Sequence, residues 1–291
     1  MINHYLVGDH VFAIEAEEQL FDLLPNYTPF LTDQIGESHV FIIHVHQHPM
    51  PENQAWTHVY TDTSDDDMPR IEMYKNDQGE WLLGVSVTKD GELVSKMQCS
   101  ANWSEVQVYT DPNYFRFAVD NAAMLVYAFR TVAMKTLLFH SSVTVRNGVG
   151  YMFLGHSGTG KSTHSRQWLQ AFDDAWLLND DNPAVRIFAD GSVRVYGTPW
   201  SGKTPCYKNE SAAVGALVQL AQAPENKITR LRMTQAYPYI LASVSGLKII
   251  PESMDAIYES IAALLEACPV YKLECLPNVE AAQLCAQTCS L

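Results

Sequence analysis

The stretch Gly155-His156-Ser157-Gly158-Thr159-Gly160-Lys161-Ser162 decides how this chain is interpreted. It matches the pattern G-x-x-x-x-G-K-[ST] of a phosphate-binding loop, or P-loop. Glycines let the backbone turn so that successive N–H groups face one anion-sized hollow, and a helix that begins near Lys161 adds the positive end of its dipole. Lys161 reaches the β- and γ-phosphates, and the Ser162 hydroxyl is a ligand for Mg²⁺. The pattern therefore predicts a site for a nucleotide triphosphate.

The sequence on both sides of this loop supports the same interpretation. Apolar residues 151–154 come directly before it, and the helix-compatible residues 161–171 begin within it. At average composition, a chain of this length contains the pattern by chance with a probability of about one in a hundred. A strand before and a helix after the loop disfavour the alternative, a Gly-rich turn that binds nothing. The residues expected to contact the nucleotide are Gly155, Ser157, Gly158, Thr159, Gly160, Lys161, Ser162 and Thr163.

Two adjacent carboxylates follow the next apolar segment. Residues 175–178 lead into Asn179-Asp180-Asp181. On its own such a pair is more often a solvated turn, but ligands of α/β sheets bind outside the carboxyl ends of the strands, next to residues in this position. One carboxylate, Asp180 in our assignment, binds Mg²⁺ together with Ser162, and the other takes the proton from an attacking hydroxyl. The sequence leaves open whether Asp180 or Asp181 is that base.

The N-terminal part reads as short strands separated by turns, because β-branched and aromatic residues recur there in near-alternation. The expected strands are residues 11–14, 39–46, 57–60, 70–74, 81–87 and 106–109, with one short helix at residues 17–24. Asp111-Pro112-Asn113 marks a boundary. Residues 117–138 then predict one long buried helix, because they are rich in Ala, Met and Leu.

From His140 onward, strand and helix patterns alternate. Asn147-Gly148 between two apolar runs is a two-residue hairpin signal. Further strands are expected at residues 143–145, 151–154, 175–178, 184–188, 193–196, 216–220 and 270–275, and helices at residues 161–171, 235–244, 253–268 and 279–289. We therefore predict an α/β (α+β) protein of two domains. They are a β-rich N-terminal module, residues 1–112, and a P-loop domain with a mixed sheet, residues 113–291, in which residues 113–138 form a linking helix.

Composition limits the possible partners. The chain has 291 residues, with 19 basic and 33 acidic side chains and a formal net charge of −14. A surface this acidic repels nucleic acid and anionic membrane, so we expect neither as a partner. The apolar run at residues 122–129 is far shorter than the ~20 residues that span a bilayer, and residues 1–5 do not resemble a signal peptide. The six cysteines are expected as reduced thiols, as in a cytoplasmic protein.

Three stretches together resemble the catalytic domain of HPr kinase/phosphorylase, a family related in fold to phosphoenolpyruvate carboxykinase. They are Leu138-Phe139-His140-Ser141-Ser142, the loop with its flanks at residues 153–163, and Leu177-Leu178-Asn179-Asp180-Asp181. That family has a histidine just ahead of the first core strand, a Gly-x-Ser-Gly-x-Gly-Lys-Ser loop and an Asp-Asp pair after the next strand. In layout, the resemblance covers residues 138–290.

The resemblance implies an HPr-kinase/carboxykinase-like P-loop fold that uses ATP and Mg²⁺. It implies that Asp181 or Asp180 is the base that activates an acceptor serine, and that His140 lies near the phosphates. The region after the Asp pair lacks the Glu-Ile-Arg-Gly signature of the true enzyme, and the N-terminal module does not resemble that enzyme's regulatory domain. We therefore expect an acceptor other than HPr: a serine in a peptide or small carrier protein, or a free small molecule.

Three other segments contain candidate functional residues. In Gly197-Thr198-Pro199-Trp200-Ser201-Gly202-Lys203-Thr204, Lys203 is expected to neutralise phosphate charge, and Ser201 or the Gly202 N–H to bind acceptor or nucleotide; the alternative is a rigid turn with Trp200 in the core. Residues 224–230 form a basic segment that reads as a surface loop; the alternative is that Lys227 or Arg230 contacts phosphate or base. The histidines of His44-Val45-His46-Gln47-His48 share one strand face but spread over about 13 Å, too far for one metal ion.

Taken together, the sequence predicts an ATP- and Mg²⁺-dependent phosphotransferase. The catalytic residues would be Lys161, Asp180, Asp181 and His140, and the acceptor a hydroxyl, in particular a serine of a protein or peptide. Two alternatives remain open: a nucleotide-binding module without catalysis, and a small-molecule kinase or carboxykinase-like enzyme. A homo-oligomer is also possible on this reading.

Overall fold

The structure is a computed structural model that describes residues 1–34, 39–51, 54–62, 69–202, 204–246 and 248–289. It is a mixed α/β protein with two mixed β-sheets. Contacts divide the chain into two compact units: Met1–Leu6 with His10–Arg130, and Val7–Asp9 with Thr131–Leu291. The division falls after residue 130, whereas the sequence placed it after residue 112. The reason is that the following helix packs within the first unit.

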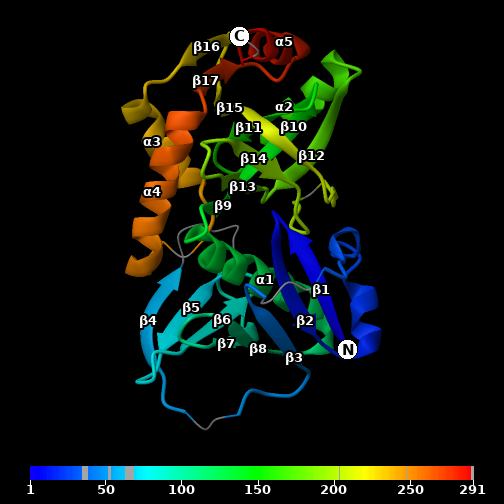
Figure 1. The fold of residues 1–291 in the computed structure, drawn as a ribbon, viewed down its shortest axis with the longest axis vertical. Coiled ribbons are helices and arrows are strands. Elements are labelled where there is room, and N and C mark those ends of the chain that lie inside the picture. Colours follow the sequence, from blue (N-terminus) through cyan, green and yellow to red (C-terminus); the bar gives the residue numbers. More distant parts are fainter. Residues whose placement is uncertain (35–38, 52–53, 63–68, 203, 247, 290–291) are drawn as a thin grey trace. The chain divides into compact units, whose positions relative to one another are not determined.

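The first unit contains an eight-stranded sheet of order β1-β2-β3-β8-β7-β6-β5-β4 (Figure 1). Its strands are β1 (Ile2–Val7), β2 (His10–Glu15), β3 (Ile42–His46), β4 (Thr57–Asp62), β5 (Ile71–Lys75), β6 (Trp81–Ser86), β7 (Leu93–Cys99) and β8 (Glu105–Thr110). The central strand β3 is parallel to β2 and β8, and the pairs from β8 to β4 are antiparallel. Short 3₁₀ helices lie at Glu18–Leu23, Thr28–Phe30 and Pro112–Tyr114.

Helix α1 (Phe115–Val132) buries its apolar side against this sheet. The Tyr127 ring contacts Phe12 of β2, and Phe129 lies 4.6 Å from the Trp103 ring, measured between centroids. The Arg130 guanidinium donates hydrogen bonds to the main-chain oxygens of Val40 and Asn102. These contacts explain why α1, up to Arg130, belongs to the first unit.

The second unit contains a nine-stranded sheet. Its path is β12-β10-β11-β15-β14-β13-β9, with β17 also beside β15 and β16 beside β17. The strands are β9 (Thr136–Leu138), β10 (Ser141–Arg146), β11 (Val149–Leu154), β12 (Ala175–Asp181), β13 (Ala184–Ile187), β14 (Val193–Tyr196), β15 (Ser211–Gln222), β16 (Lys227–Arg230) and β17 (Val270–Cys275). Its helices are α2 (Lys161–Ala171), α3 (Met233–Ser243), α4 (Pro251–Ala267) and α5 (Val279–Cys289).

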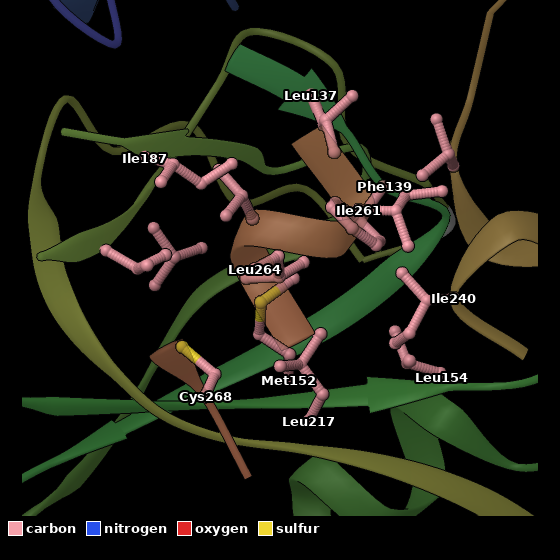
Figure 2. Packing of buried hydrophobic residues seen from close by; sticks show 14 of the residues in the cluster. Leu137, Phe139, Met152, Leu154, Ile187, Leu217, Ile240, Ile261, Leu264 and Cys268 are labelled. Carbon is pink, nitrogen blue, oxygen red and sulfur yellow. The ribbon is translucent and has the colours of Figure 1, made fainter. Parts of the chain in front are cut away.

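Two apolar cores lie on opposite faces of this second sheet, because side chains alternate between faces along each strand. Figure 2 shows part of one core, where Met152 and Leu154 of β11 pack with residues of α3 and α4 such as Ile240 and Ile261. The other core joins the alternate residues of β11 and β15 to α2 and α5, with Trp168 of α2 fully buried at its centre. A helix pair thus covers each face.

The structure confirms most of the expected elements of the second unit. The bounds of α2, α5, β14 and β17 are as predicted, and Asn147 and Gly148 take the positive φ angles, 52° and 75°, that a type I′ hairpin turn requires. The expected helix over residues 117–138 is wrong at its C-terminal end: α1 stops at Val132, and Lys135 has a φ of 56°. Thr136–Leu138 instead pair with β13 as β9.

Three further strands, β1, β7 and β16, were not predicted from the sequence. The basic segment expected as a loop therefore contributes Lys227–Arg230 to the edge of the sheet, paired with β17. In the part of the chain that the structure describes, no helix is long and apolar enough to cross a membrane.

Candidate functional site

The loop of residues 155–162 connects β11 to α2 and has a backbone that favours glycine. Gly155, Gly158 and Gly160 have φ angles of 149°, 77° and 108°, a region that L side chains rarely adopt. Gly160 is the N-cap of α2, and within the described residues no side chain caps this helix. The main-chain N–H groups of its first turn are therefore available to an anion.

Lys161 is the first residue of α2, and its side chain folds back over the loop. The Nζ donates hydrogen bonds to the main-chain oxygens of Gly155, at 2.9 Å, and His156, at 3.2 Å. Burial lowers the pKa of the Lys161 amine, while the charges of Asp181 and Asp180 act in the opposite direction. The ammonium group thus lies at the loop and within electrostatic reach of the Asp pair.

Asp180 and Asp181 are the last residues of β12. Because β11 and β12 both run antiparallel to β10, their C-terminal ends, and therefore the aspartates and the loop, lie at the same end of the sheet. Asp180 lies opposite Ser142 of β10, and Asp181 lies opposite Ser141. Directly opposite residues share a sheet face, and adjacent residues take opposite faces. Because the Ser142 Oγ is 2.6 Å from the Ser165 Oγ of α2, Asp180 is on the face that α2 covers. Asp181 is on the other face.

The Asp180 side chain carries an unpartnered polar atom. Only 7% of the residue is exposed, and its Oδ1 has no hydrogen-bond partner among the described residues. A buried carboxylate oxygen without a partner is rare in proteins, since its desolvation is not offset. A bound cation would supply the missing interaction, and Ser162 lies in the first turn of α2, the helix that covers this face.

The Asp181 carboxyl is half-buried and next to a histidine. Burial and the neighbouring Asp180 charge raise the pKa of Asp181 to about 6, although Lys161 acts to lower it. The Nε2 of His140 lies 3.6 Å from the Asp181 Oδ1. His140 is held at the start of β10 by its main-chain N–H, which donates to the Ser243 oxygen. The structure therefore brings His140 next to Asp181 and both carboxylates within electrostatic reach of Lys161.

The segment after β14 packs along the end of β12. Asp181 and Ser201 form an isolated antiparallel bridge, and the Gly202 N–H donates to the Asp180 main-chain oxygen at 3.2 Å. Trp200 is buried, which confirms the alternative in which its indole belongs to the core. The Ser201 hydroxyl donates to the Thr204 oxygen, so Ser201 and Gly202 hold the segment in place. The predicted phosphate contact, Lys203, lies outside the described residues.

Sequence reasoning missed two side-chain pairs at this site. The Ser245 hydroxyl, after α3, donates to the Asn182 Oδ1 at 2.9 Å. On the other side of the loop, the Gln222 amide at the end of β15 donates to the Gly158 oxygen at 3.2 Å. Neither pair has a local sequence signal, because each joins segments that are far apart in the chain.

The histidines that the sequence suggested as alternative metal ligands have other partners. In the first unit, both ring nitrogens of His44 pair with carboxylates, those of Glu15 and Glu105. The His46 ring stacks on Tyr109. All six cysteines are free thiols, and a search of the described residues finds no group of three or more His, Cys, Asp or Glu arranged to hold a metal ion.

Comparisons with known proteins add no assignment: no protein-family model matches the chain, and a search of curated proteins finds no match.

Proposed function

We propose that the chain is an ATP- and Mg²⁺-dependent phosphotransferase whose second unit is a P-loop catalytic domain. One observation carries the proposal. The glycine loop, the Lys161 ammonium and two carboxylates in different environments lie at the same end of the sheet. A loop and helix N-terminus attract phosphates, and a carboxylate with a raised pKa accepts a proton. These are the parts that phosphoryl transfer to a hydroxyl requires.

The triphosphate is the proposed ligand of residues 155–163. The loop glycines and the first turn of α2 supply N–H groups, and Lys161 supplies a positive charge on a flexible stem. Binding of phosphate would replace the hydrogen bonds of Lys161 to Gly155 and His156, so the amine needs to move only from loop carbonyls to phosphate oxygens. Lys161 then lowers the energy of the negative charge that builds up on the phosphates in the transition state.

Asp180 and Ser162 are suited to hold Mg²⁺. The orphaned Asp180 Oδ1 is a hard oxygen ligand on the α2 face, and Mg²⁺ usually takes one or two carboxylates together with substrate phosphates and water. When bound, the ion would neutralise part of the phosphate charge. Neighbouring Asp181 faces the other side and stays available for proton transfer.

Asp181 is the proposed general base. Its carboxylate takes the proton of the acceptor hydroxyl, whose oxygen forms a bond to the γ-phosphorus while the bond from that phosphorus to the β,γ-bridging oxygen breaks and ADP leaves. A pKa of about 6 keeps the carboxylate largely ionised at neutral pH and makes it a stronger base than an ordinary Asp. His140, 3.6 Å away, is placed to hold the carboxylate in position.

The resemblance to HPr kinase supports a serine of a protein or peptide as the acceptor. It rests on His140, the loop and the Asp pair, which lie together in this structure. The six free thiols are in keeping with a cytoplasmic location, and the net charge of −14 argues against nucleic acid as a partner.

Replacement of Lys161 tests the proposal. The wild-type chain is incubated with Mg²⁺, γ-labelled ATP and a fractionated lysate, next to Lys161→Ala and, as a control, Lys96→Ala at an exposed position of β7 in the first unit. We expect label on a protein band, at a rate that falls about 100-fold or more in Lys161→Ala but not in the control, with an unchanged far-UV circular dichroism spectrum. Label on a metabolite would indicate a small-molecule kinase. Binding of Mg-ATP without any transfer would indicate a nucleotide-binding module instead.

A further inference from the structure

A cavity of about 550 Å³ adjoins the glycine loop on the side away from the Asp pair. Its lining comes from the loop and the start of α2, and from the C-terminal ends of β15 and β17. The residues are Gly158, Thr159, Gly160, Thr163, His164, Leu220, Gln222, Ala223, Cys275, Leu276 and Pro277. In the strand order β12-β10-β11-β15-β17, the loop follows the middle strand. The aspartates therefore lie on one side of the loop and the cavity on the other.

The position of this cavity matches the shape of a nucleotide. A triphosphate whose terminal phosphate points to Asp181 must extend its α-phosphate and ribose in the opposite direction. In that direction lie Thr163 and the cavity. The volume is also within the range of about 300–1,000 Å³ that small-ligand pockets occupy.

Beyond the loop itself, the chemistry of the lining favours an uncharged occupant. Among the described residues that line the cavity, none is Lys, Arg, Asp or Glu, and the walls are mainly apolar, from Leu220, Leu276 and Pro277. Burial lowers the pKa of His164 to about 4, and its Nε2 accepts a hydrogen bond from the Trp168 indole, so the ring is neutral. An uncharged, flat heterocycle fits such walls, whereas a phosphate or carboxylate does not.

Gln222 is the polar side chain best placed to recognise that heterocycle. It ends β15 at the cavity and is held there by the hydrogen bond from its Nε2 to the Gly158 oxygen. An amide has a second N–H and an acceptor oxygen, the pair that matches adjacent acceptor and donor groups on a purine edge. The same side chain thus touches the loop and faces the cavity.

We propose that this cavity binds the base and ribose of a purine nucleotide whose phosphates occupy the glycine loop, and that Gln222 contacts the base. The inference rests on the proposed function, because it uses the loop as the phosphate site. It adds the place where the nucleoside binds and the side chain that contacts the base.

Binding measurements separate the cavity from the loop. Isothermal titration compares Mg-ATP with Mg-tripolyphosphate, which has phosphates but no nucleoside, on the full chain. Ala223→Trp, which fills the cavity, is expected to weaken Mg-ATP about 10- to 100-fold and to leave tripolyphosphate unchanged. Gln222→Ala is expected to weaken ATP and GTP more than tripolyphosphate, because it removes a contact to the base as well as the hydrogen bond to the Gly158 oxygen. Gln283→Ala, on the exposed side of α5, serves as the matched control. Lys161→Ala should weaken both ligands.

Photolabelling tests the same inference without a variant. With 8-azido-ATP, the wild-type chain should be labelled on the peptide that contains Leu276 and Pro277, and excess ATP or GTP should suppress this label better than CTP or UTP. Equal binding of ATP to the wild type and Ala223→Trp would overturn the cavity assignment while leaving the loop intact. Equal competition by pyrimidine nucleotides would overturn the choice of purine. If neither ATP nor tripolyphosphate binds the wild type, the proposed function and this inference both fail.

Discussion

Asp180 and Asp181 are adjacent in sequence but perform different tasks in our proposal, because the alternation of a strand points them to opposite faces. Asp180 is buried on the α2 side, and one of its oxygens has no hydrogen-bond partner in the described part of the chain. Asp181 is half-buried near His140, and its pKa is raised to about 6. A strand end thus gives two carboxylates that cannot substitute for each other.

The pH dependence of phosphoryl transfer follows from the raised pKa of Asp181. As a base, the carboxyl group must be ionised, so kcat/KM should fall about tenfold per pH unit below the pKa of about 6. Asp181→Asn should lower transfer about 10²- to 10⁴-fold and remove this limb of the profile. The measurement is kcat/KM from pH 5 to 8, with Asp174→Asn as control, since Asp174 is an exposed residue that pairs with Arg146. A wild-type profile that stays flat to pH 5 would exclude Asp181 as the base.

The raised pKa of Asp181 also affects stability. Activity should increase with pH, whereas this contribution to the free energy of unfolding should decrease. The pKa of Asp181 is higher in the folded chain than the ordinary value of about 4 in an unfolded chain, so the folded state binds more protons between these two values. The free energy of unfolding should therefore decrease as pH rises from about 4 to about 6. Asp181→Asn should remove this contribution, so that the variant gains stability relative to the wild type above pH 6.

At the scale of elements, a buried hydroxyl pair joins α2 to the sheet behind the site. The Ser142 Oγ of β10 and the Ser165 Oγ of α2 are 2.6 Å apart, and both residues are buried. Two positions along β10, the buried Thr144 Oγ1 has no hydrogen-bond partner within the described chain. The two hydroxyls provide a matched comparison, one paired and one not.

Ser165→Ala should cost about 1–3 kcal/mol of unfolding free energy, because it leaves the Ser142 hydroxyl buried without a partner. Thr144→Val removes a hydroxyl that already lacks a partner, so its cost should be near zero, or the chain should become more stable by about 1 kcal/mol. Urea denaturation followed by circular dichroism measures both. Equal losses for the two variants would show that the Ser142–Ser165 bond does not contribute.

Local signals explain which elements the sequence predicts well. The glycines and Lys161 determine where α2 begins, and Asn147-Gly148 determines the hairpin, since both depend on residues within one turn. The end of α1 was wrong because Thr136–Leu138 are as apolar as the helix before them. Their assignment as β9 depends on β13, which lies far along the chain. Strand β16 was missed because its burial is slight, and only its pairing with β17 defines it.

The candidate site shows the same difference between features set by local sequence and features set by contacts between distant segments. The loop and the Asp pair were predicted because each is a compact motif, and the resemblance placed His140 next to them. Gln222 and the cavity beyond it were not predicted, since they depend on which strand neighbours β11 in the sheet. The split between Asp180 and Asp181 likewise needs the register of β12 against β10.

For the whole molecule, the division into two units determines which segments a bound ligand should stabilise. The loop, the Asp pair and the cavity all belong to the second unit, and their strands and helices share its two apolar cores. A ligand that binds only the folded form stabilises it by about 2.7 kcal/mol at a concentration of 100 Kd. That energy protects the segments whose opening destroys the site, and not segments that unfold separately.

Hydrogen exchange read by mass spectrometry should therefore localise the effect of Mg-ATP. We expect slower exchange in peptides from β11 through α2, from the end of β12 and from the β15 and β17 ends, with no change in β3 to β8 of the first unit. Lys161→Ala with the same nucleotide provides the control, and its exchange should match that of the free wild type. Protection spread evenly over both units would mean that the two units open as one cooperative body. Protection confined to the first unit would place the nucleotide in that unit and not at the glycine loop. Because phosphates and nucleoside are proposed to bind on opposite sides of the β11 end, tripolyphosphate should protect the loop and the start of α2 but leave the β17 end unchanged.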